Sequence, residues 1–564
     1  MSTTRRTQAP EPRFDVAVVG AGPAGLAAAG EAAHQGARVV VIDSSEQPGG
    51  QFWRHRSEAA GVADDGALHH SWKTYLALRS AFDEGIGSGA ITYLPVTSVW
   101  MAQRVAATDG FLLRLTPSYG AGRAAVPSVR AGRLVLATGA YDRQLPLPGW
   151  DLPGVIAAGG IQAFGKQNGM LPGKRFVIAG TGPFLLSVAA GVAHQGGHVA
   201  AVLESSNLMG WLPRAHRAAG VPAKALEGVE YVGAFLKHRI PYRPRTVITE
   251  ILGEDRVTGV RTARVRRNGS VVPGSERQIA GIDTVGLGWG FTPQMELPVQ
   301  LGAGTRQDSD GSLIAIVDED QRSTIDGLFI AGELTGVGGA ALAVLEGRVA
   351  GRVAGAEAAG AVSGARGAAS GARGAASGAR GAAASSACSS ASAGRRGATR
   401  SELRGISRQR SFAEAMNLAH PVPAGWQHLL QDDTIVCRCE EVPASALREV
   451  RSSMAGEDLR TQKGLNRAGM GWCQGRVCGF AVSCMASGAD ETESASSVSS
   501  GEVGQPGASR PGAASRPGAA SQPGTESQPS AVSQPSAVSL AQSAKRPLAQ
   551  PLPLSELAAL ADLE

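Results

Sequence analysis

The stretch that decides the fold is FDVAVVGAGPAGLAAAGEAAHQGARVVVID, residues 14–43. It opens with an apolar strand at 16–19, passes through the pattern Gly20-x-Gly22-x-x-Gly25 and continues as an Ala-rich helix. A second strand at 37–42 ends at Asp43. A glycine pattern alone is a weak signal. With both strands, the helix and the acid in place, it is typical of a dinucleotide-binding βαβ unit.

Each of these residue types has a physical task. Gly20 permits a tight turn, and Gly22 lets a pyrophosphate approach the backbone. Gly25 allows the helix to pack close to the sheet, so that the helix N-terminus faces the phosphates. Asp43 can accept hydrogen bonds from ribose hydroxyls. With the strands and helices that alternate up to about residue 350, this predicts a doubly wound α/β fold.

Two distant stretches indicate which dinucleotide is bound. LVLATGA (134–140) reads as an apolar strand ending in small residues, and TIDGLFIAGELTGVGGAALAVLEGRVAG (324–351) as a buried strand, a glycine turn and a helix. Both resemble the FAD domain of two-dinucleotide-domain flavoproteins, and PGGQFWR (48–54) stands where such proteins pass the flavin. A hydrogen bond from Gln51 to the flavin and a plain loop role are both compatible with that position. The resemblance implies an FAD site made of Gly20, Gly22, Pro23, Ala24, Gly25, Asp43, Gly50, Gln51, Thr138, Gly139, Gly332, Glu333, Gly338 and Gly339.

A second copy of the βαβ unit lies within the first, in KRFVIAGTGPFLLSVAAGVAHQGGHVAAVLES (174–205). Gly180 and Gly182 hold the first two glycine positions, but Leu185 holds the third, which we expect to push the helix off the sheet or change its packing. Glu204 ends the next strand and favours a ribose without a 2′-phosphate, so NADP is disfavoured. Bound NAD, another adenine nucleotide and a purely structural unit all remain open. A thioredoxin reductase is excluded, because no cysteine precedes Cys388.

Four of the six cysteines fall in CRCEEV (437–442) and GMGWCQGRVCG (469–479). Cys437 and Cys439 can point to one side of an extended segment and share a centre with Cys473 and Cys478. Four thiolates suit either a [2Fe–2S] cluster or structural zinc, and the redox flavin machinery in the same chain favours the cluster. Cys484 is expected to be a spare thiol.

Composition divides the rest of the chain. Of the 564 residues, those from 352 to 410 include ten Arg and two Glu, so the whole net charge of +6 can be assigned to this stretch. Because Ala, Gly, Ser and Arg cannot bury enough surface to offset the entropy of ordering, we expect residues 358–402 within it to be a disordered linker. No aromatic or basic platform suggests specific nucleic-acid binding. The domains we expect are an FAD domain at 14–155 and 281–357, an NAD-like Rossmann unit at 156–280, a disordered linker at 358–402, a small C-terminal domain at 405–486, a disordered Ser/Pro/Gly linker at 487–548 and a terminal helix at 549–564.

The cysteine motifs also carry a family resemblance. TIVCRCEEV (434–442) with KGLNRAGMGWCQGRVCG (463–479) resembles the [2Fe–2S] domain that is similar to bacterioferritin-associated ferredoxin. It looks like the version found in alpha subunits of heteromeric dye-linked amino-acid and opine dehydrogenases, and sarcosine oxidase alpha chains share the core. The resemblance implies an electron-relaying subunit that holds FAD and the cluster. Substrate is then oxidised in a beta subunit of the glycine- or sarcosine-oxidase type, FMN can lie at the interface, and a quinone or dye accepts the electrons.

Two other functions stay open: a stand-alone NADH-dependent reductase, and a non-enzymatic assembly subunit. No pair of side chains is singled out for acid–base catalysis, so the catalytic residues are unknown. His55, His69 and His70 are expected in loops or at the surface. The N-terminal residues lack the apolar segment of a signal peptide, and no stretch is long and apolar enough to cross a bilayer. We therefore expect a cytoplasmic protein, or one peripheral to the inner face of the membrane.

Overall fold

The structure is a computed structural model of the 564-residue chain. It describes residues 11–58, 69–105, 110–118, 126–371, 397–423, 425–454, 456–488, 535, 537–546 and 548–550. Nearly all of the terminal helix expected at 549–564 lies outside this range, as does Cys388.

The first sheet is built on the stretch at 14–43. Strand β1 (Arg13–Val19) pairs in parallel with β2 and β6, and the sheet order is β3-β2-β1-β6-β5-β4 with β19 also pairing with β6. All four residues of β2 are buried, as expected for a parallel strand that is covered on both faces. The other strands of this sheet are β2 (Val39–Ile42), β3 (Ile91–Leu94), β4 (Thr97–Val105), β5 (Gly110–Pro117), β6 (Ser128–Leu136) and β19 (Leu328–Ile330).

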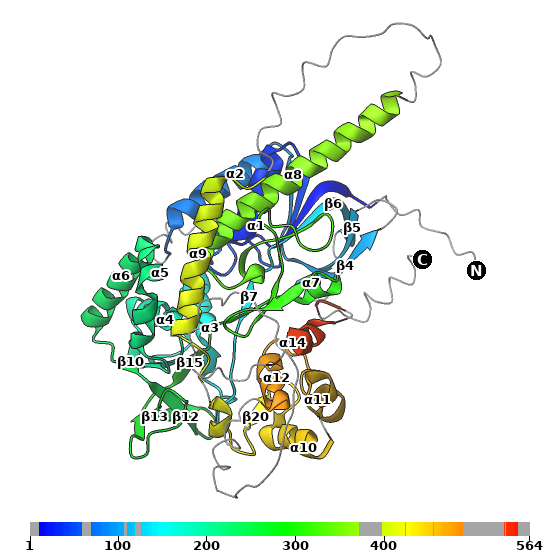
Figure 1. Cartoon of the computed structure of the whole chain (residues 1–564). Helices are drawn as coiled ribbons and strands as arrows, with labels where there is room; N and C mark the ends of the chain where they lie inside the picture. The colour runs from blue at the N-terminus through cyan, green and yellow to red at the C-terminus, as the bar shows by residue number, and fades with distance from the viewer. Residues whose placement is uncertain are drawn as a thin grey trace, which may run out of the picture.

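Helices α1 (Pro23–His34) and α8 (Ala340–Gly371) cover one face of this sheet, with α2 (Trp72–Gly87) beside them (Figure 1). Helices α1 and α8 pack against each other through a row of small residues. A Cβ added at Gly347 would lie 2.2 Å from the carbonyl oxygen of Ala24, and one at Gly351 would lie 2.1 Å from that of Ala28. This close contact buries α1 and holds its N-terminus at the end of β1.

We expect Gly351→Ala to destabilise the protein, because the added methyl would collide with backbone that cannot move aside. Overpacking of this kind costs about 1–3 kcal/mol. Gly228→Ala on α6 (Pro222–His238) is the matched control, since no atom lies within 4 Å of its added Cβ. Thermal melting followed by circular dichroism should show a lower midpoint for Gly351→Ala only. Equal midpoints for the two variants would contradict this account of the α1–α8 contact.

The second sheet is fully parallel, in the order β11-β10-β9-β15-β8. Its glycine turn leads into α4 (Phe184–His194), and α3 (Ala158–Asn168) packs beside it. Leu185 does not push α4 off the sheet. It is fully buried and lies against Gly288 of β15, whose missing side chain makes the room. The strands are β8 (Val155–Ala157), β9 (Arg175–Gly180), β10 (His198–Glu204), β11 (Tyr242–Pro244) and β15 (Thr284–Gly288).

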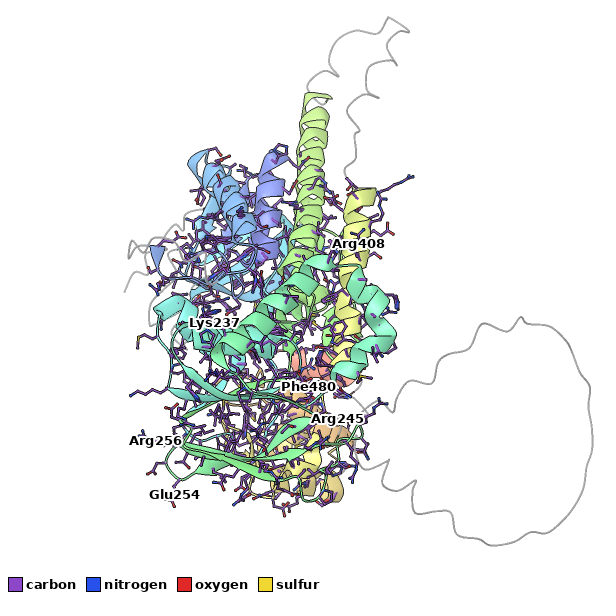
Figure 2. All side chains as sticks on the ribbon, turned by 90° about the vertical axis from the view of Figure 1, so that its left-hand side faces the viewer. Lys237, Arg245, Glu254, Arg256, Arg408 and Phe480 are labelled. Carbon is purple, nitrogen blue, oxygen red and sulfur yellow. The ribbon has the colours of Figure 1, made fainter. Side chains whose placement is uncertain are left out.

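Smaller elements complete the two nucleotide units. An antiparallel sheet, β12-β13-β14, lies beside the second sheet, and the pairs β7–β16 and β17–β18 lie near the end of the first. Figure 2 shows Glu254 and Arg256 at the exposed tip of the β12–β13 hairpin. The bounds are β7 (Ala140–Asp142), β12 (Thr246–Gly253), β13 (Val257–Arg264), β14 (Arg277–Ala280), β16 (Phe291–Pro293), β17 (Thr305–Gln307), β18 (Leu313–Ala315), α5 (Ala215–Ala219) and α7 (Glu296–Gln300).

The cysteine-containing part of the chain is a small helical group below the two sheets (Figure 1). It packs on the FAD part through Phe480, whose ring lies 4.4 Å from the guanidinium carbon of buried Arg143. Its elements are β20 (Ile435–Cys437), β21 (Val442–Pro443), α10 (Ala444–Met454), α11 (Leu459–Asn466) and α12 (Gly479–Ser487).

The structure differs from the expected linkers in three places. Helix α8 continues to Gly371, because Ala is the strongest helix former and the Ala-rich repeat can extend an existing helix. Helix α9 (Arg400–Ala419) begins inside the first expected linker, where Thr399 and Glu402 form a capping box. Helix α14 (Ala537–Ala544) lies inside the second and buries Leu540 against the FAD part. Among the described helices, none is both long and apolar enough to cross a membrane.

Candidate functional site

One cavity of about 1460 Å³ runs along the predicted sites. It is lined by every residue of the predicted FAD site except Gly25, and it continues past Gly182 of the second unit to Cys473. Gly180, Glu204 and the other three cysteines of the predicted cluster do not line it. The predicted FAD residues in its wall are Gly20, Gly22, Pro23, Ala24, Asp43, Gly50, Gln51, Thr138, Gly139, Gly332, Glu333, Gly338 and Gly339.

The first glycine turn has the geometry that its sequence predicts. Gly20 has φ of +101°, and a Cβ there would lie 2.4 Å from the carbonyl oxygen of Ala137. Gly25 packs behind the turn, where a Cβ would lie 1.8 Å from the carbonyl oxygen of Gly20. By contrast, a Cβ at Gly22 would meet no protein atom closer than 3.9 Å. The turn therefore leaves space for a ligand only at Gly22.

Asp43 closes one side of the site. Its carboxylate accepts hydrogen bonds from the backbone N–H groups of Ala21 and Ser45, the latter at 2.6 Å. Burial raises the pKa of this carboxyl above its ordinary value. The side chain is thus fixed at the end of β2, where a ribose hydroxyl could donate to it.

Glu333 sits at the N-terminus of α8. Its carboxylate accepts from the backbone N–H groups of Gly338, at 3.2 Å, and Gly339, at 3.0 Å. Burial raises its pKa to about 7. These amides and the positive end of the helix dipole favour negative charge at this point. The glycine turn can therefore stabilise either a carboxylate or an electron-rich edge of a ligand.

Two residues that the sequence did not single out hold this turn in place. Glu346 of α8 is 1% exposed and accepts hydrogen bonds from the backbone N–H of Gly332 and the hydroxyl of Thr335, both at 2.9 Å. Arg410 of α9 donates to Glu346 at 2.5 Å and to the carbonyl oxygen of Gly336 at 2.8 Å. An acid within an Ala-rich buried helix was the one available signal for Glu346. Nothing local pointed to Arg410.

Several titratable side chains near the cavity are buried. His55 and His69 lie in loops, as expected, but are only 7% and 8% exposed. Burial lowers the pKa of His69 to about 3, and the charge of Lys166 adds to the effect. Among cavity-lining groups, burial lowers the pKa of Lys166 to about 8 and raises that of Asp142 to about 6.

The four clustered cysteines lie in contact with one another. The neighbouring Cys478 thiol lowers the pKa of Cys437 to about 6 and that of Cys473 to about 4. The backbone N–H of Gly469 points at the Cys437 sulfur, 3.4 Å away. Within the described residues, no three His, Cys, Asp or Glu side chains are arranged to hold one metal ion. Four neighbouring thiols, with a backbone amide aimed at one sulfur, are donors that suit either a [2Fe–2S] cluster or structural zinc.

The cysteine loop reaches the FAD part directly. Arg476 donates to the Tyr141 hydroxyl at 2.8 Å and pairs with Glu296 at 2.9 Å. Tyr141 follows the predicted FAD residues Thr138 and Gly139 along the chain, and it lines the cavity. Cys473 lines the same cavity. One continuous space therefore joins the predicted flavin site to the predicted cluster.

The second glycine turn is also formed. Gly180 and Gly182 have φ values of +145° and +95°, and a Cβ at Gly180 would lie 1.7 Å from the carbonyl oxygen of Gly288. Glu204, predicted to bind a ribose, accepts from the backbone N–H of Gly182 at 2.9 Å. It is 1% exposed and lies outside the cavity wall.

The two linked nucleotide-type units and the cavity between them define a flavoprotein oxidoreductase. The chain belongs to the pyridine nucleotide-disulphide oxidoreductase family, whose model matches residues 14–360. It is an FAD-dependent oxidoreductase, and the predicted fold class of this part is confirmed. The match ends before the cysteines, so the C-terminal [2Fe–2S] domain stays a prediction.

The chain is similar over most of its length to particular members of that family. It is 31% identical over 486 residues to one subunit of the opine oxidase of Rhizobium meliloti, and the match covers 84% of this chain and 92% of that protein. It is 29% identical over 462 residues to hydrogen cyanide synthase subunit HcnB of Pseudomonas protegens, covering 82% and 89%. L-Proline dehydrogenase from P. horikoshii has the same fold, with a TM-score of 0.52, 19% identity and coverage of 85% and 75%. The predicted family resemblance is confirmed.

Proposed function

We propose that the chain is the electron-relaying subunit of a heteromeric amino-acid or opine dehydrogenase. The single observation that carries this proposal is the cavity that joins the predicted FAD residues to Cys473. Arg476 strengthens the connection, because it contacts Tyr141 beside the flavin site and belongs to the loop that carries Cys473 and Cys478.

The residue types present supply donors for both cofactors. Gly22 would let the pyrophosphate approach the backbone, Asp43 could accept from a ribose, and by the family resemblance the turn before α8 would face the pyrimidine edge of the flavin. Cys437, Cys439, Cys473 and Cys478 supply four thiolates. When bound, FAD exchanges two electrons with its donor and a [2Fe–2S] cluster exchanges one at a time. When bound, the two groups would lie along one cavity, which Arg476, a positive charge, also lines.

The relatives support a partner subunit. The similar chains from opine oxidase and hydrogen cyanide synthase are each named as one subunit of an enzyme. We infer that this chain also works in a hetero-oligomer. By the resemblance, the partner is a flavoprotein of the glycine- or sarcosine-oxidase type that oxidises the amino acid or opine, and a quinone or dye takes up the electrons. FMN at the subunit interface is part of the same proposal.

The test uses the purified full-length chain under anaerobic conditions. We expect flavin and [2Fe–2S] absorbance in the isolated chain, bleaching of both by dithionite, and reoxidation of both by an added quinone. We expect no bleaching when NADH is added in excess. Rapid bleaching of the flavin by NADH would favour the stand-alone reductase instead. A chain that carries neither flavin nor iron would favour an assembly subunit.

A further inference from the structure

The second nucleotide unit has a wall that its βαβ pattern does not explain. The cavity passes along the turn at Thr181 and Gly182, where the βαβ pattern places a nucleotide. The acid at the end of the second strand should then face the cavity and receive the ribose hydroxyls. Instead, the wall at this point is formed by Trp211 and His420, and Glu204 lies outside it.

A directed chain of hydrogen bonds fixes this wall. The indole N–H of Trp211 donates to Nε2 of His420 at 2.9 Å, and an indole nitrogen is a donor only. His420 Nε2 therefore carries no proton. Nδ1 of His420 can then donate to the Ser206 hydroxyl, 2.7 Å away, and that hydroxyl donates to Oε1 of Glu204 at 2.8 Å. Each donor in this chain of hydrogen bonds then has an acceptor.

Three of the four acceptor positions of the Glu204 carboxylate are taken, and the imidazole of His420 stands in front of the fourth. Oε1 accepts from both the backbone N–H and the hydroxyl of Ser206, and Oε2 accepts from the backbone N–H of Gly182 and faces His420 Nδ1 at 3.6 Å. The imidazole and the serine hydroxyl thus stand where two ribose hydroxyls would bind. Burial raises the pKa of Glu204, but its contacts with His420 and Ser206 outweigh this effect, and the net shift is downward.

The segment that carries His420 is held firmly. It follows α9, which is tied to α5 by an ion pair of 3.0 Å between Glu414 and Arg217. A Cβ at Gly210 would lie 3.0 Å from the carbonyl oxygen of Ala419, so the end of α9 packs directly on the loop that carries Trp211. Figure 2 shows Arg408, which lies nearer the N-terminus of α9, beside the helices of the second unit. Displacing His420 would require these contacts to open as well.

We propose that His420 is the residue that determines nucleotide specificity in the second unit, and that it excludes NAD(H) by taking the place of the ribose on Glu204. The unit keeps the dinucleotide fold but is closed to a pyridine nucleotide by the chain's own α9 segment. This inference rests on contacts within the chain. It does not depend on the electron-relay function, although it accounts for a flavoprotein that takes its electrons from a source other than NADH.

The test measures NADH binding to the full-length, flavin-loaded protein by titration calorimetry. We expect no measurable binding of NADH to the wild type. We expect His420→Ala to bind NADH at least about tenfold more tightly than the weakest affinity that the titration can detect. Trp211→Phe keeps a ring of similar shape but removes the donor that orients His420, and we expect it to give an intermediate gain. His428→Ala is the matched control, because His428 is exposed and lies outside this network.

The affinity for NADPH distinguishes two effects of His420→Ala: freeing the Glu204 carboxylate for a ribose, and simply enlarging the cavity. The 2′-phosphate of NADPH would meet the Glu204 carboxylate, so His420→Ala should gain affinity for NADH and not for NADPH. Wild-type protein that already binds NADH as tightly as the variant would overturn the proposal. So would a His420→Ala protein that keeps its flavin and melting temperature but gains no affinity for NADH, or gains it equally for NADPH. A failure of the electron-relay proposal would appear instead as missing iron or a cluster that dithionite does not reduce.

Discussion

Cys439→Ser is expected to remove the iron–sulfur centre while leaving the flavin bound. Cys439 is exposed, so a serine there costs the fold little, whereas a [2Fe–2S] cluster needs all four thiolates of its site. We expect at least about a tenfold loss of iron per chain, and loss of dye reduction in the assembled enzyme, because the relay from the flavin site would end at an incomplete cluster. Iron and sulfide analysis, with the visible spectrum, measures the first effect directly.

Cys484→Ala provides a demanding control for that experiment. Cys484 is 2% exposed in α12, so its replacement disturbs the core of the small helical group more than a change at Cys439 does. It lies outside the CxC and CxxxxC motifs, and we expect the variant to keep its iron. A Cys439→Ser protein with full iron content would remove Cys439 from the ligand set. If the wild-type chain contained zinc and no iron, the four cysteines would hold a structural metal and not a cluster.

Much of the FAD site was readable because its determinants are local. Gly20, Gly22 and Asp43 stand at positions whose spacing is set by one strand, one turn and one helix. Short-range geometry of this kind is fixed by backbone sterics and by the rise of the elements, so a sequence pattern can specify it. The predicted cavity residues from four separate stretches also came together, because parallel strands bring their carboxyl ends to the same edge of a sheet.

The behaviour of Leu185 could not be read in the same way. A leucine at the third glycine position looked like a steric fault. Its compensation is Gly288, about a hundred residues away on the neighbouring strand, where a Cβ would lie 3.0 Å from the leucine side chain. The local pattern reports which residue fills a position but not how much room the opposite surface leaves. Only the strand order β9-β15 joins the two residues.

The role of α9 was hidden for a related reason. Arg410 and His420 reach the FAD turn and Glu204, and both contacts depend on how one exposed-looking helix lies across two units. Helix α14 was hidden by composition, since it is a short apolar segment, SAVSLAQSA at 536–544, within a region rich in Ser and Pro. Average composition indicates that a region cannot form its own core. It does not exclude a few residues that complete the core of another part.

Gly22→Ala is expected to yield a folded protein with greatly weakened FAD binding. Gly22 has φ of −74°, an ordinary value for alanine, and its added Cβ meets no protein atom closer than 3.9 Å. The methyl would instead occupy the space through which a pyrophosphate approaches the N-terminus of α1. Overpacking costs about 1–3 kcal/mol, which corresponds to roughly five- to 150-fold weaker binding of FAD. Equilibrium dialysis against FAD, after removal of the bound flavin, measures this change.

Two neighbouring glycines separate the ligand's contribution from that of the fold. Gly25→Ala would place a methyl 1.8 Å from the carbonyl oxygen of Gly20, which is itself confined by Ala137, so this variant should lose both flavin and stability. At Gly30, on the same helix, the nearest atom to an added Cβ is 4.0 Å away, and alanine there should bind FAD normally and gain up to about 1 kcal/mol of helix stability. If Gly22→Ala bound FAD as well as Gly30→Ala does, the pyrophosphate could not lie at this turn. If it unfolded like Gly25→Ala, the free space at Gly22 would not be the reason for its glycine.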